Sequence, residues 1–477
     1  MKIATIGFEK LSREKTLRSD FEFQNDQSHL DSNFYLFKEL FDLPVSQEVK
    51  EQDLYEDFLY CEIGNVDNNG NISPVKLNFD NRNLIDENYY SKIEKGDIMS
   101  VDIGEILISK VRPNLKKYVF INEANHSVYF TKAFIKIKPK IMPAVLYYCL
   151  RTVFNRKLVA ASRQGKGYPT VGQMDLEQLR FEKHIIDKLI THEKEITEKI
   201  KLIDEKTKEL QDGIVSAEEI IDSVFQNEFN IDKDALIRID NAQLSFISLA
   251  SISEKNINCR LSYRWNKANQ IQNELSKQLN CCQPLGPHIL NTQNGWSPSC
   301  SDDSNMDYQV LGIDAINKSG ILSFENPKYS SEYKNDLEKY TISNGDFFVS
   351  RGNTTSLVAL ASIAYTNAET PPTIFPDLMI KITFGTAVNQ TYMAYVFNSF
   401  IGRLYFKYAT KGKNQTMVKV SSRELSDFIV PIPDILTQEQ IACHIQREIE
   451  KQNDLQEQIL NLRNQIHQII IATIQKC

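Results

Sequence analysis

No stretch of the 477-residue sequence is apolar over the roughly 18 residues that a membrane-spanning helix needs. The N-terminal segment also lacks the long apolar run and the small-residue cleavage site of a secretory signal. None of the eight cysteines forms a CxxC motif or precedes histidines at zinc-finger spacing. We therefore expect a cytoplasmic protein with reduced thiols, no membrane partner and no metal site.

Motifs for catalysis are missing as well. The sequence contains no GxxxxGK[ST] loop for nucleotide phosphates, no GxGxxG and no [DN]PP[FY] motif of amino-methyltransferases. It contains no HExxH or GxSxG motif, and no ExK follows Pro376-Asp377 at nuclease spacing. We expect neither catalytic residues nor a cofactor in this chain.

The overall charge is acidic, but basic residues are concentrated in two segments. The net charge is -7 and the pI is about 5.7. Thirteen Lys or Arg and one acid lie between Lys110 and Lys166, and seven basic residues and no acid lie between Lys381 and Arg423. Binding to nucleic acid depends on where charge lies rather than on its sum, so these segments are candidate contact surfaces.

Four blocks of the first half recur in the same order in the second half, at separations of 241 to 250 residues. The pairs are LRSDFEF around Arg18 with CRLSYRW around Arg260, EIGNVDNNGNI from Glu62 with GIDAINKSGIL from Gly312, GEILISK from Gly104 with GDFFVSR from Gly345, and Gly165-Lys166 with Gly412-Lys413. Small drifts in separation are what loop insertions between fixed strands produce. The pattern predicts a tandem duplication.

Within each repeat, strand-like and helix-like segments alternate. GEILISK and GDFFVSR are apolar runs behind a Gly-acid turn and predict buried strands, and VYFTKAFIKIK and DLMIKITF predict the next strands. Aromatic segments starting at residues 144 and 391 predict helices. The fold class expected for each repeat is α+β.

Each repeat is followed by a long helical pattern. Apolar residues recur in steps mostly of three, four and seven after Phe181 and again after Pro433, with no proline and only Gly213 as a weak point. The positions are Leu189, Ile196, Ile200, Ile203, Leu210, Ile214, Ile221 and Val224, then Ile441, Ile445, Leu455, Ile459, Leu462, Ile466 and Ile469. Two stripes of this length predict helices that pair as a coiled coil, with packing of each helix on its own domain as the alternative.

Two loops in each repeat combine basic, amide and hydroxyl side chains. Arg suits guanine, Asn or Gln suits adenine, a Thr methyl suits thymine, and Lys suits phosphate. The candidate DNA-binding residues are Lys110, Arg112, Asn114, Lys116, Lys117, Arg163, Gln164, Lys166 and Tyr168 in the first repeat, and Arg351, Asn353, Thr354, Lys411, Lys413, Asn414 and Gln415 in the second. A merely solvated basic surface is the alternative.

These residues resemble the specificity subunits of type I restriction-modification systems. The similar segments are GEILISKVRPNLKK and GYPTVGQMDLEQLRF in the first repeat, and GDFFVSRGNTT, KGKNQT and IVPIPDILTQEQIACHI in the second. The first repeat departs from the family where Phe181-Glu182-Lys183-His184 replaces the Pro-rich start of the terminal helix, which puts that junction in doubt.

The resemblance implies two tandem target-recognition domains, each reading half of a bipartite site in double-stranded DNA, joined by two long helices paired as an antiparallel coiled coil. The implied boundaries are 1–182 and 233–436 for the domains, and 183–232 and 437–477 for the spacer helices. The implied partners are methyltransferase subunits and a motor-nuclease subunit, which would hold the S-adenosylmethionine, ATP and Mg. We expect the helices to act as a ruler that sets the spacing of the half-sites.

Two other interpretations stay open. One is a recognition subunit of another methylation-linked phage-defence complex, which the identity of the helices' partner would decide. The other is a coiled-coil adaptor that binds proteins, which binding to random duplex DNA would test.

Overall fold

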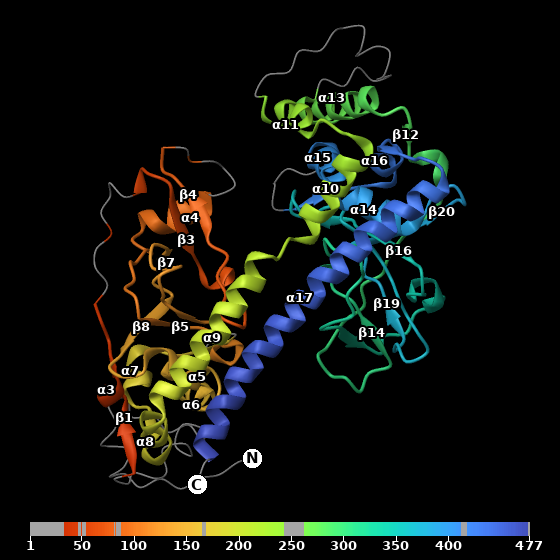
Figure 1. Cartoon of the computed structure of the whole chain (residues 1–477). Helices are drawn as coiled ribbons and strands as arrows, with labels where there is room; N and C mark the ends of the chain where they lie inside the picture. The colour runs from red at the N-terminus through yellow and green to blue at the C-terminus, as the bar shows by residue number, and fades with distance from the viewer. Residues whose placement is uncertain are drawn as a thin grey trace. The chain divides into compact units, whose positions relative to one another are not determined.

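The structure is a computed structural model that describes residues 33–45, 49, 54–80, 82, 87–164, 168–242, 262–411 and 417–475. The chain divides into two compact units (Figure 1). Unit 1 comprises residues 1–212 and 457–477, and unit 2 comprises residues 213–456. Each unit is a mixture of helices and short strands, as the α+β prediction requires.

Unit 1 contains two main sheets. Its strands are β1 (Phe34–Leu36), β2 (Phe41–Asp42), β3 (Phe58–Cys61), β4 (Val75–Leu77), β5 (Ile106–Ser109), β6 (Tyr118–Phe120), β7 (Tyr129–Phe130), β8 (Phe134–Pro139), β9 (Arg163–Gln164), β10 (Pro169–Thr170) and β11 (Arg180–Glu182). Its helices are α3 (Phe37–Leu40), η2 (Ile63–Asn65), α4 (Glu87–Glu94), η3 (Pro113–Leu115), α5 (Pro143–Arg151), α6 (Asn155–Ala161), α7 (Gln173–Glu177), α8 (Lys183–Thr191) and α9 (Glu193–Asp212).

Unit 2 is built in the same way. Its strands are β12 (Cys282–Pro284), β13 (Ile289–Asn294), β14 (Tyr308–Val310), β15 (Lys328–Ser330), β16 (Phe347–Ser350), β17 (Gly352–Asn353), β18 (Ala361–Ile363), β19 (Thr373–Ile374), β20 (Met379–Phe384), β21 (Val418–Lys419) and β22 (Ile429–Pro431). Its helices are α10 (Ala217–Phe229), α11 (Lys233–Asn241), α13 (Tyr263–Gln278), η4 (Gly286–His288), η5 (Ile313–Ala315), η6 (Leu337–Tyr340), α14 (Gln390–Asn398), α15 (Phe400–Ala409) and α16 (Ser422–Ser426), and α17 (Ile435–Gln475) continues into unit 1.

The strand orders of the two units match. A four-stranded antiparallel sheet has the order β2-β8-β5-β6 in unit 1 and β13-β20-β16-β18 in unit 2. A three-stranded sheet has the order β4-β3-β7 in unit 1 and β15-β14-β19 in unit 2, each with one antiparallel and one parallel pair. The duplication predicted from the sequence is therefore a duplication of the fold. The repeat pair around Arg18 and Arg260 lies outside the described residues.

The Gly-acid turn before each central strand is also duplicated. Gly104 has φ of 86° and Gly345 has φ of 83°, in the region that favours glycine. The acid after each glycine accepts a hydrogen bond from a backbone amide two residues before that glycine and pairs with a lysine of the neighbouring strand. The predicted strands GEILIS and GDFFVS are confirmed as β5 and β16, and both are buried throughout.

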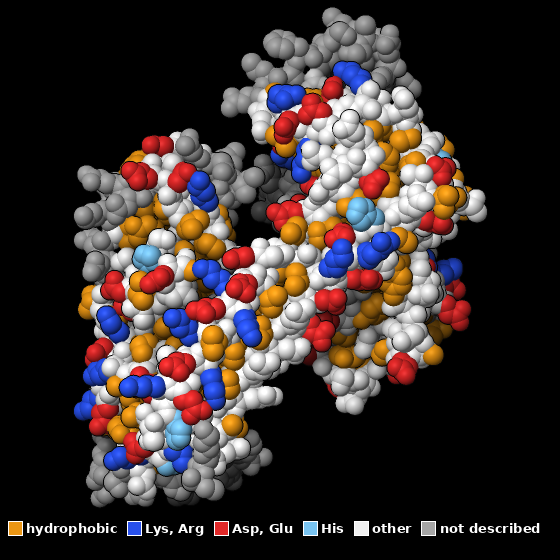
Figure 2. Space-filling view, in the orientation of Figure 1, with side chains coloured by type: hydrophobic (Ala, Val, Ile, Leu, Met, Phe, Trp, Pro, Cys, Tyr) orange, Lys and Arg blue, Asp and Glu red, His pale blue; other side chains and the backbone are white. Residues whose placement is uncertain are grey.

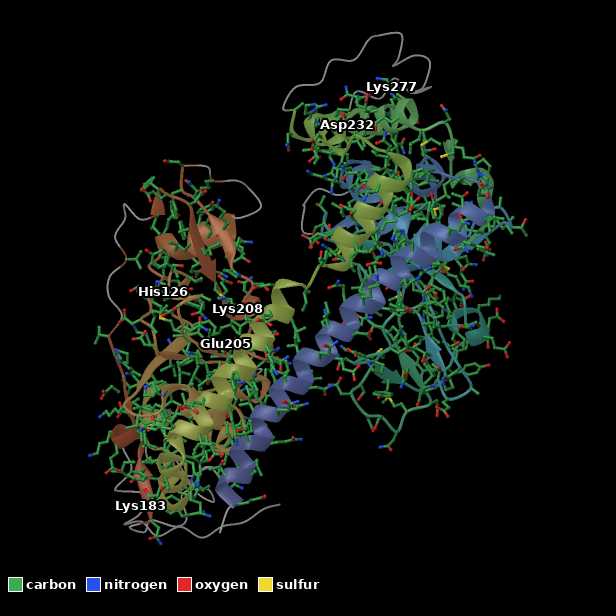
Figure 3. The ribbon with its side chains drawn as sticks, in the orientation of Figure 1. His126, Lys183, Glu205, Lys208, Asp232 and Lys277 are labelled. Atoms are coloured by element: carbon green, nitrogen blue, oxygen red, sulfur yellow. The ribbon has the colours of Figure 1, made fainter. Side chains whose placement is uncertain are left out.

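The two spacer helices pair within each unit. In unit 1, the apolar face of α9 packs with the C-terminal part of α17, where Ile200 and Ile466 join one core. In unit 2, α10 packs with the N-terminal part of α17, where Ile221 and Ile445 join another core. Polar positions of α9, such as Glu205 and Lys208, are exposed to solvent (Figure 3).

Specific contacts fix the helix directions. In unit 1, Lys188 Nζ, just before α9, donates to Ile474 O at 2.8 Å near the end of α17. In unit 2, the amide of Val215 donates to Gln452 Oε1 at 2.9 Å, and His444 Nδ1 lies 3.4 Å from Glu228 Oε1. In unit 2, later residues of the first helix therefore meet earlier residues of α17, which makes this pair antiparallel.

The central spacer helix is not the continuous rod expected over 183–232. It is three successive helices, α8, α9 and α10, interrupted at His192 and between Asp212 and Ala217. Glycine at 213 costs helical stability, and Ser216 then caps α10 by accepting from Glu219 N at 3.2 Å. The C-terminal spacer α17, by contrast, is one helix of 41 residues.

Two further expectations concern membranes and cysteines. No helix among the described residues is long and apolar enough to cross a membrane. The six described cysteines, which are Cys61, Cys149, Cys281, Cys282, Cys300 and Cys443, are free thiols.

Candidate nucleic-acid interface

The two candidate loops of the first repeat lie side by side. Val111 forms a β-bridge with Thr170, and the amide of Arg112 donates to Pro169 O at 2.8 Å. Strand β10 in turn pairs with β9, which begins at Arg163. We call these joined segments, residues 110–112, 163–164 and 168–171, the first platform.

The second repeat builds the same arrangement. Strand β17 pairs with β21, and the amide of Val420 donates to Arg351 O at 2.9 Å. Lys411 forms a β-bridge with Lys419 on the other side. Residues 351–353, 411 and 417–420 form the second platform. Sequence reasoning placed the two loops of each repeat at equivalent positions but did not predict that they join.

The first platform continues into a strained turn. Arg112 and Lys116 have φ of 49° and 53°, which is uncommon for residues other than glycine. Buried groups hold the turn in this shape: Tyr118 Oη donates to Pro113 O at 3.0 Å, and Arg151 Nη1 donates to Lys116 O at 2.8 Å. Backbone strain that is held this firmly is typical of binding sites.

Several predicted side chains of the first repeat face solvent. Lys110, Arg112 and Asn114 are exposed, and the Arg112 guanidinium lies 5.3 Å from the centre of the exposed Tyr168 ring. An arginine on an aromatic ring is pre-oriented for a planar partner such as a base edge. Lys117 is half-buried and donates to Ile63 O at 3.0 Å, so part of its hydrogen-bonding capacity serves the fold.

On the second platform, Thr354 is exposed while Arg351 and Asn353 are half-buried. Arg351 Nη1 donates to Asp377 O at 3.2 Å, and Asn353 Oδ1 accepts from Thr354 N at 2.8 Å. The guanidinium of Arg351 still has further N–H groups for a ligand, since an arginine carries five.

Arg163 and Lys411 hold equivalent positions and make equivalent contacts. Arg163 Nη2 lies 2.6 Å from Asp175 Oδ1, and Lys411 Nζ lies 2.7 Å from Glu424 Oε1. Each cation is therefore bound to a carboxylate of its own unit.

Much of the charge in the two basic runs is used inside the fold. Lys157 is buried and lies 3.0 Å from Glu182 Oε1, and Arg403 Nη1 donates to Val358 O at 2.7 Å. Lys407 pairs with Asp240 at 2.9 Å. On the described part of the face drawn in Figure 2, basic and acidic side chains are interspersed. The count of basic residues alone thus overstates the charge available to a ligand.

Some predicted residues lie outside the description, and some relevant ones were missed. Lys166, Lys413, Asn414 and Gln415 are outside the described residues, and only the backbone of Gln164 is described. The exposed Lys419 and the carboxylates of Asp175 and Glu424 were not predicted. The alternation of buried Val418, exposed Lys419 and buried Val420 is a strand signal that points to Lys419.

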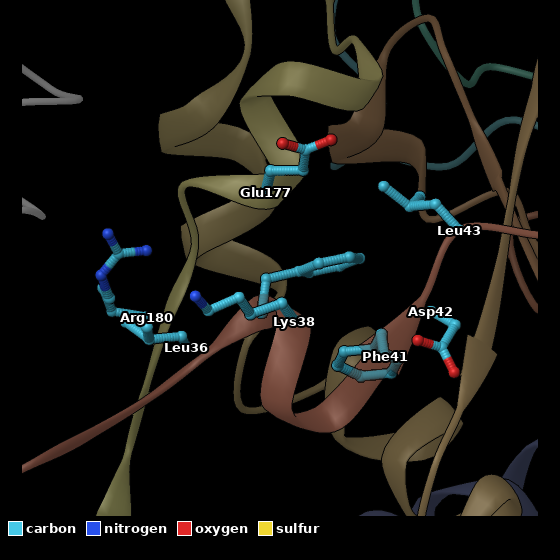
Figure 4. Close-up of a pocket in the computed structure, with 8 residues that line it drawn as sticks. Leu36, Lys38, Phe41, Asp42, Leu43, Glu177 and Arg180 are labelled. Atoms are coloured by element: carbon cyan, nitrogen blue, oxygen red, sulfur yellow. The ribbon is translucent and has the colours of Figure 1, made fainter. Parts of the chain in front are cut away.

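The pocket drawn in Figure 4 lies against α3 and the end of α7, and none of its lining residues belongs to the first platform. It has a volume of about 350 Å³ and is lined by Leu36, Phe37, Lys38, Phe41, Asp42, Leu43, Glu177 and Arg180. Burial lowers the pKa of Arg180, whose Nη1 donates to Gln178 O at 2.8 Å. The described residues include no group of three or more His, Cys, Asp or Glu side chains placed to hold a metal ion.

The model of the type I restriction modification DNA specificity domain matches residues 289–464, which include the second platform and much of α17. The match is to the same family that the sequence resembles, and it covers residues 289–464 of the chain. Unit 1 repeats the strand orders of the matched domain.

Other comparisons add little. No curated protein matches the sequence. A structure described as "Structural basis underlying complex assembly and conformational transition of the type I R-M system" aligns at 13% identity over 94% of this chain and 98% of that chain, with a TM-score of 0.35. The HsdS subunit from Thermoanaerobacter tengcongensis aligns at 13% identity over 93% and 95%, with a TM-score of 0.29. The type I restriction-modification S subunit from M. genitalium aligns at 12% identity over 94% and 98%, with a TM-score of 0.38.

Proposed function

We propose that this chain is the DNA sequence-recognition subunit of a type I restriction-modification complex and that it reads a bipartite target, one half-site per repeat. The observation that carries the proposal is the platform, which two different sequence segments build with equivalent β-pairings and an equivalent cation-carboxylate contact. One repeat matches a DNA specificity domain, and its fold occurs twice in the chain. Together these observations favour two DNA-recognition domains in one chain.

The division of labour within a platform follows from side-chain chemistry. Arg112, Asn114, Arg351 and Thr354 are suited to base edges, where each good bidentate contact is worth roughly 1–3 kcal/mol of discrimination. Lys110 and Lys419 are suited to phosphates, which set affinity and its dependence on salt rather than sequence. We expect readout in the major groove, where the four base pairs are distinguishable.

In this proposal the chain is non-catalytic. Methyltransferase subunits and a motor-nuclease subunit supply the chemistry, and S-adenosylmethionine, ATP and Mg belong to them. The absence of their sequence motifs from this chain supports that assignment. Such a subunit acts where chromosomal and incoming DNA are found, and we propose a cytoplasmic location.

The paired helices would set the half-site spacing. Seven residues are about two helical turns, so inserting seven after Thr207 in α9 and seven after Ile459 in α17 keeps both apolar seams in phase. The insertions add about 10 Å of helix, or roughly three base pairs at about 3.4 Å each.

Methylome sequencing of a host that carries the complex gives the target of each variant. The expected result is the wild-type half-sites with a spacer about three base pairs longer. The matched control inserts seven residues between Gly213 and Val215, where no helix continues, and should leave the spacer unchanged. An unchanged spacer in the double-helix variant would refute the ruler.

Binding to duplex DNA and the identity of the protein partners distinguish the other two interpretations from this proposal. A complex purified from its native host should retain duplex DNA on a filter in a salt-sensitive and sequence-selective way. Loss of selectivity with retained protein partners would favour the adaptor, whereas selective binding with a different partner set would favour another methylation-linked defence complex.

A further inference from the structure

Each short helix next to a platform carries a buried carboxylate at its third position. Asp175 of α7 is 2% exposed and Glu424 of α16 is 6% exposed. One oxygen of each accepts a hydrogen bond from the amide that precedes the helix: Gly172 N to Asp175 Oδ2 at 2.8 Å, and Ser421 N to Glu424 Oε2 at 3.0 Å. This bond fixes the carboxylate relative to the helix start.

The other oxygen of each carboxylate binds the platform. Arg163 Nε and Nη2 donate to Asp175 Oδ1 at 2.8 and 2.6 Å, which fixes the plane of the guanidinium. Lys411 Nζ lies 2.7 Å from Glu424 Oε1. The contact thus links two segments of each unit, the platform strand and the short helix.

The electrostatics favour a lasting contact. Burial by itself would raise the pKa of Glu424, but the hydrogen bonds from Lys411 and Ser421 outweigh burial and lower it. The carboxylate is therefore ionised at neutral pH, and a buried ion is destabilising without its partner. The two cations are only partly covered, with side-chain exposures of 44% for Arg163 and 56% for Lys411, so competition from a DNA phosphate is the alternative to test.

We propose that Asp175 and Glu424 are positioning residues, which hold Arg163 and Lys411 on the protein so that these cations fix the shape of the platforms instead of contacting DNA. The inference rests on the proposed function and reassigns two residues that the sequence analysis counted as DNA-binding. Each carboxylate should support the reading of one half-site only.

The first test measures the salt dependence of binding to the cognate duplex, with the target taken from methylome sequencing and the complex purified from its host. A lost phosphate contact lowers the slope of log K against log salt concentration by about one. Lys411→Gln should leave the slope unchanged, whereas the matched variant Lys419→Gln, at an exposed position of the same platform, should lower it by about one. A decrease of about one for Lys411→Gln would overturn the inference.

The second test measures discrimination against single-base changes in each half-site. Glu424→Gln should lower discrimination at least tenfold in one half-site and leave the other unchanged, and Asp175→Asn should do the reverse. The matched control is Asp427→Asn, since Asp427 follows α16 directly but is exposed, and its carboxylate lies 3.7 Å from Arg423 Nε. Equal losses in both half-sites, or no loss, would contradict the assignment.

Two measurements keep folding and function apart. Thermal unfolding of each variant identifies a global loss of structure, and the conservative variant Arg163→Lys should retain most of the discrimination because it keeps the charge on Asp175. If the wild-type complex binds DNA without sequence preference, the proposed function itself fails. If the wild type is selective and only the salt-slope result differs from expectation, the proposed function stands and this inference fails.

Discussion

Replacing Lys136 with methionine should weaken the central sheet of unit 1 strongly. Lys136 Nζ lies 3.5 Å from Glu105 Oε2, and the two side chains are 5% and 0% exposed. At an effective dielectric constant of about 20, two unit charges at this distance attract each other by about 5 kcal/mol. Removing one partner of a buried pair typically costs about 3–5 kcal/mol, because the other charge stays buried. Among the described residues Glu105 Oε1 has no hydrogen-bond partner, so without Lys136 the carboxylate keeps only the hydrogen bond from the amide of Asp102.

The matched variant is Lys381→Met in unit 2. Lys381 and Asp346 form the equivalent pair at 2.7 Å, but their side chains are 23% and 13% exposed, so water screens the remaining carboxylate and we expect a loss of about 1–2 kcal/mol. Native-state hydrogen exchange of the amides in β5 and β16 measures the opening free energy of each sheet separately. A smaller loss for Lys136→Met than for Lys381→Met would refute the reasoning.

The pH dependence gives a second check on the same variant. Burial raises the pKa of Glu105 above its ordinary value of 4.5, while Lys136 lowers it. A carboxyl whose pKa is raised by folding stabilises the folded state below its ordinary pKa. This stabilisation is lost as the pH rises through the pKa of the folded state. Without Lys136 the pKa of Glu105 rises further. The deficit of Lys136→Met should therefore be largest at neutral pH and shrink near pH 4, and a deficit independent of pH would contradict this.

Three further predictions concern single residues. Gly70→Ala should destabilise unit 1 by about 3–5 kcal/mol in thermal unfolding, because its Cβ would lie 2.4 Å from Tyr118 O and φ is 85°. Gly104→Ala, with φ of 86° and no atom within 4 Å, should cost only about 1–2 kcal/mol, and equal losses would contradict this. Ile466→Ala should cost about 2–5 kcal/mol in denaturant unfolding and increase amide exchange in the helix packed against it, because Ile466 is fully buried; unchanged exchange would count against the helix pairing. The lowered pKa of Glu424 stabilises the folded wild type above the ordinary pKa of 4.5, and this stabilisation is lost as the pH falls through the pKa of the folded state. Glu424→Gln should therefore not show this acid-induced loss of stability. Acid titration of both proteins measures it, and parallel curves would contradict it.

The strands and helix faces were predictable because local rules agreed with the final packing. A glycine, an acid and an apolar run predicted β5 and β16, and the structure shows why: the glycines adopt positive φ and the runs are buried. The helical stripes were right for most positions, which lie in the cores of the two helix pairs, whereas Leu210, Ile214, Leu455 and Ile459 belong to neither core. Patterns of this kind depend on neighbours within a few residues.

The break in the central helix was only partly predictable. Gly213 was recognised as a weak point, but a continuous helix was expected across it. The capping signature S-A-E-E at 216–219, in which Ser216 N donates to Glu219 Oε2 at 3.0 Å, was the local signal for a new helix start.

Whether each basic residue is exposed or paired inside the fold could not be predicted, because the pairing depends on partners distant in sequence. Lys157 meets Glu182, and Lys407 meets Asp240, 167 residues away. A charge run counted along the chain does not distinguish such internal pairs from exposed cations. The joining of the two loops in each platform was unpredictable for the same reason, since it rests on the long-range pairings of Val111 with Thr170 and of Gly352 with Lys419.

The two repeats agree in their frame and differ in their reading residues. The contact of Arg163 with Asp175 becomes Lys411 with Glu424, where a shorter cation meets a longer acid and the link is kept. At the loop after the central strand, by contrast, Val-Arg-Pro in the first repeat stands where Gly-Asn-Thr stands in the second. Different donors and acceptors on equivalent frames favour different bases. The two half-sites proposed for this chain should therefore differ in sequence. The residues that hold each platform together, rather than those proposed to contact bases, preserve the similarity between the two repeats.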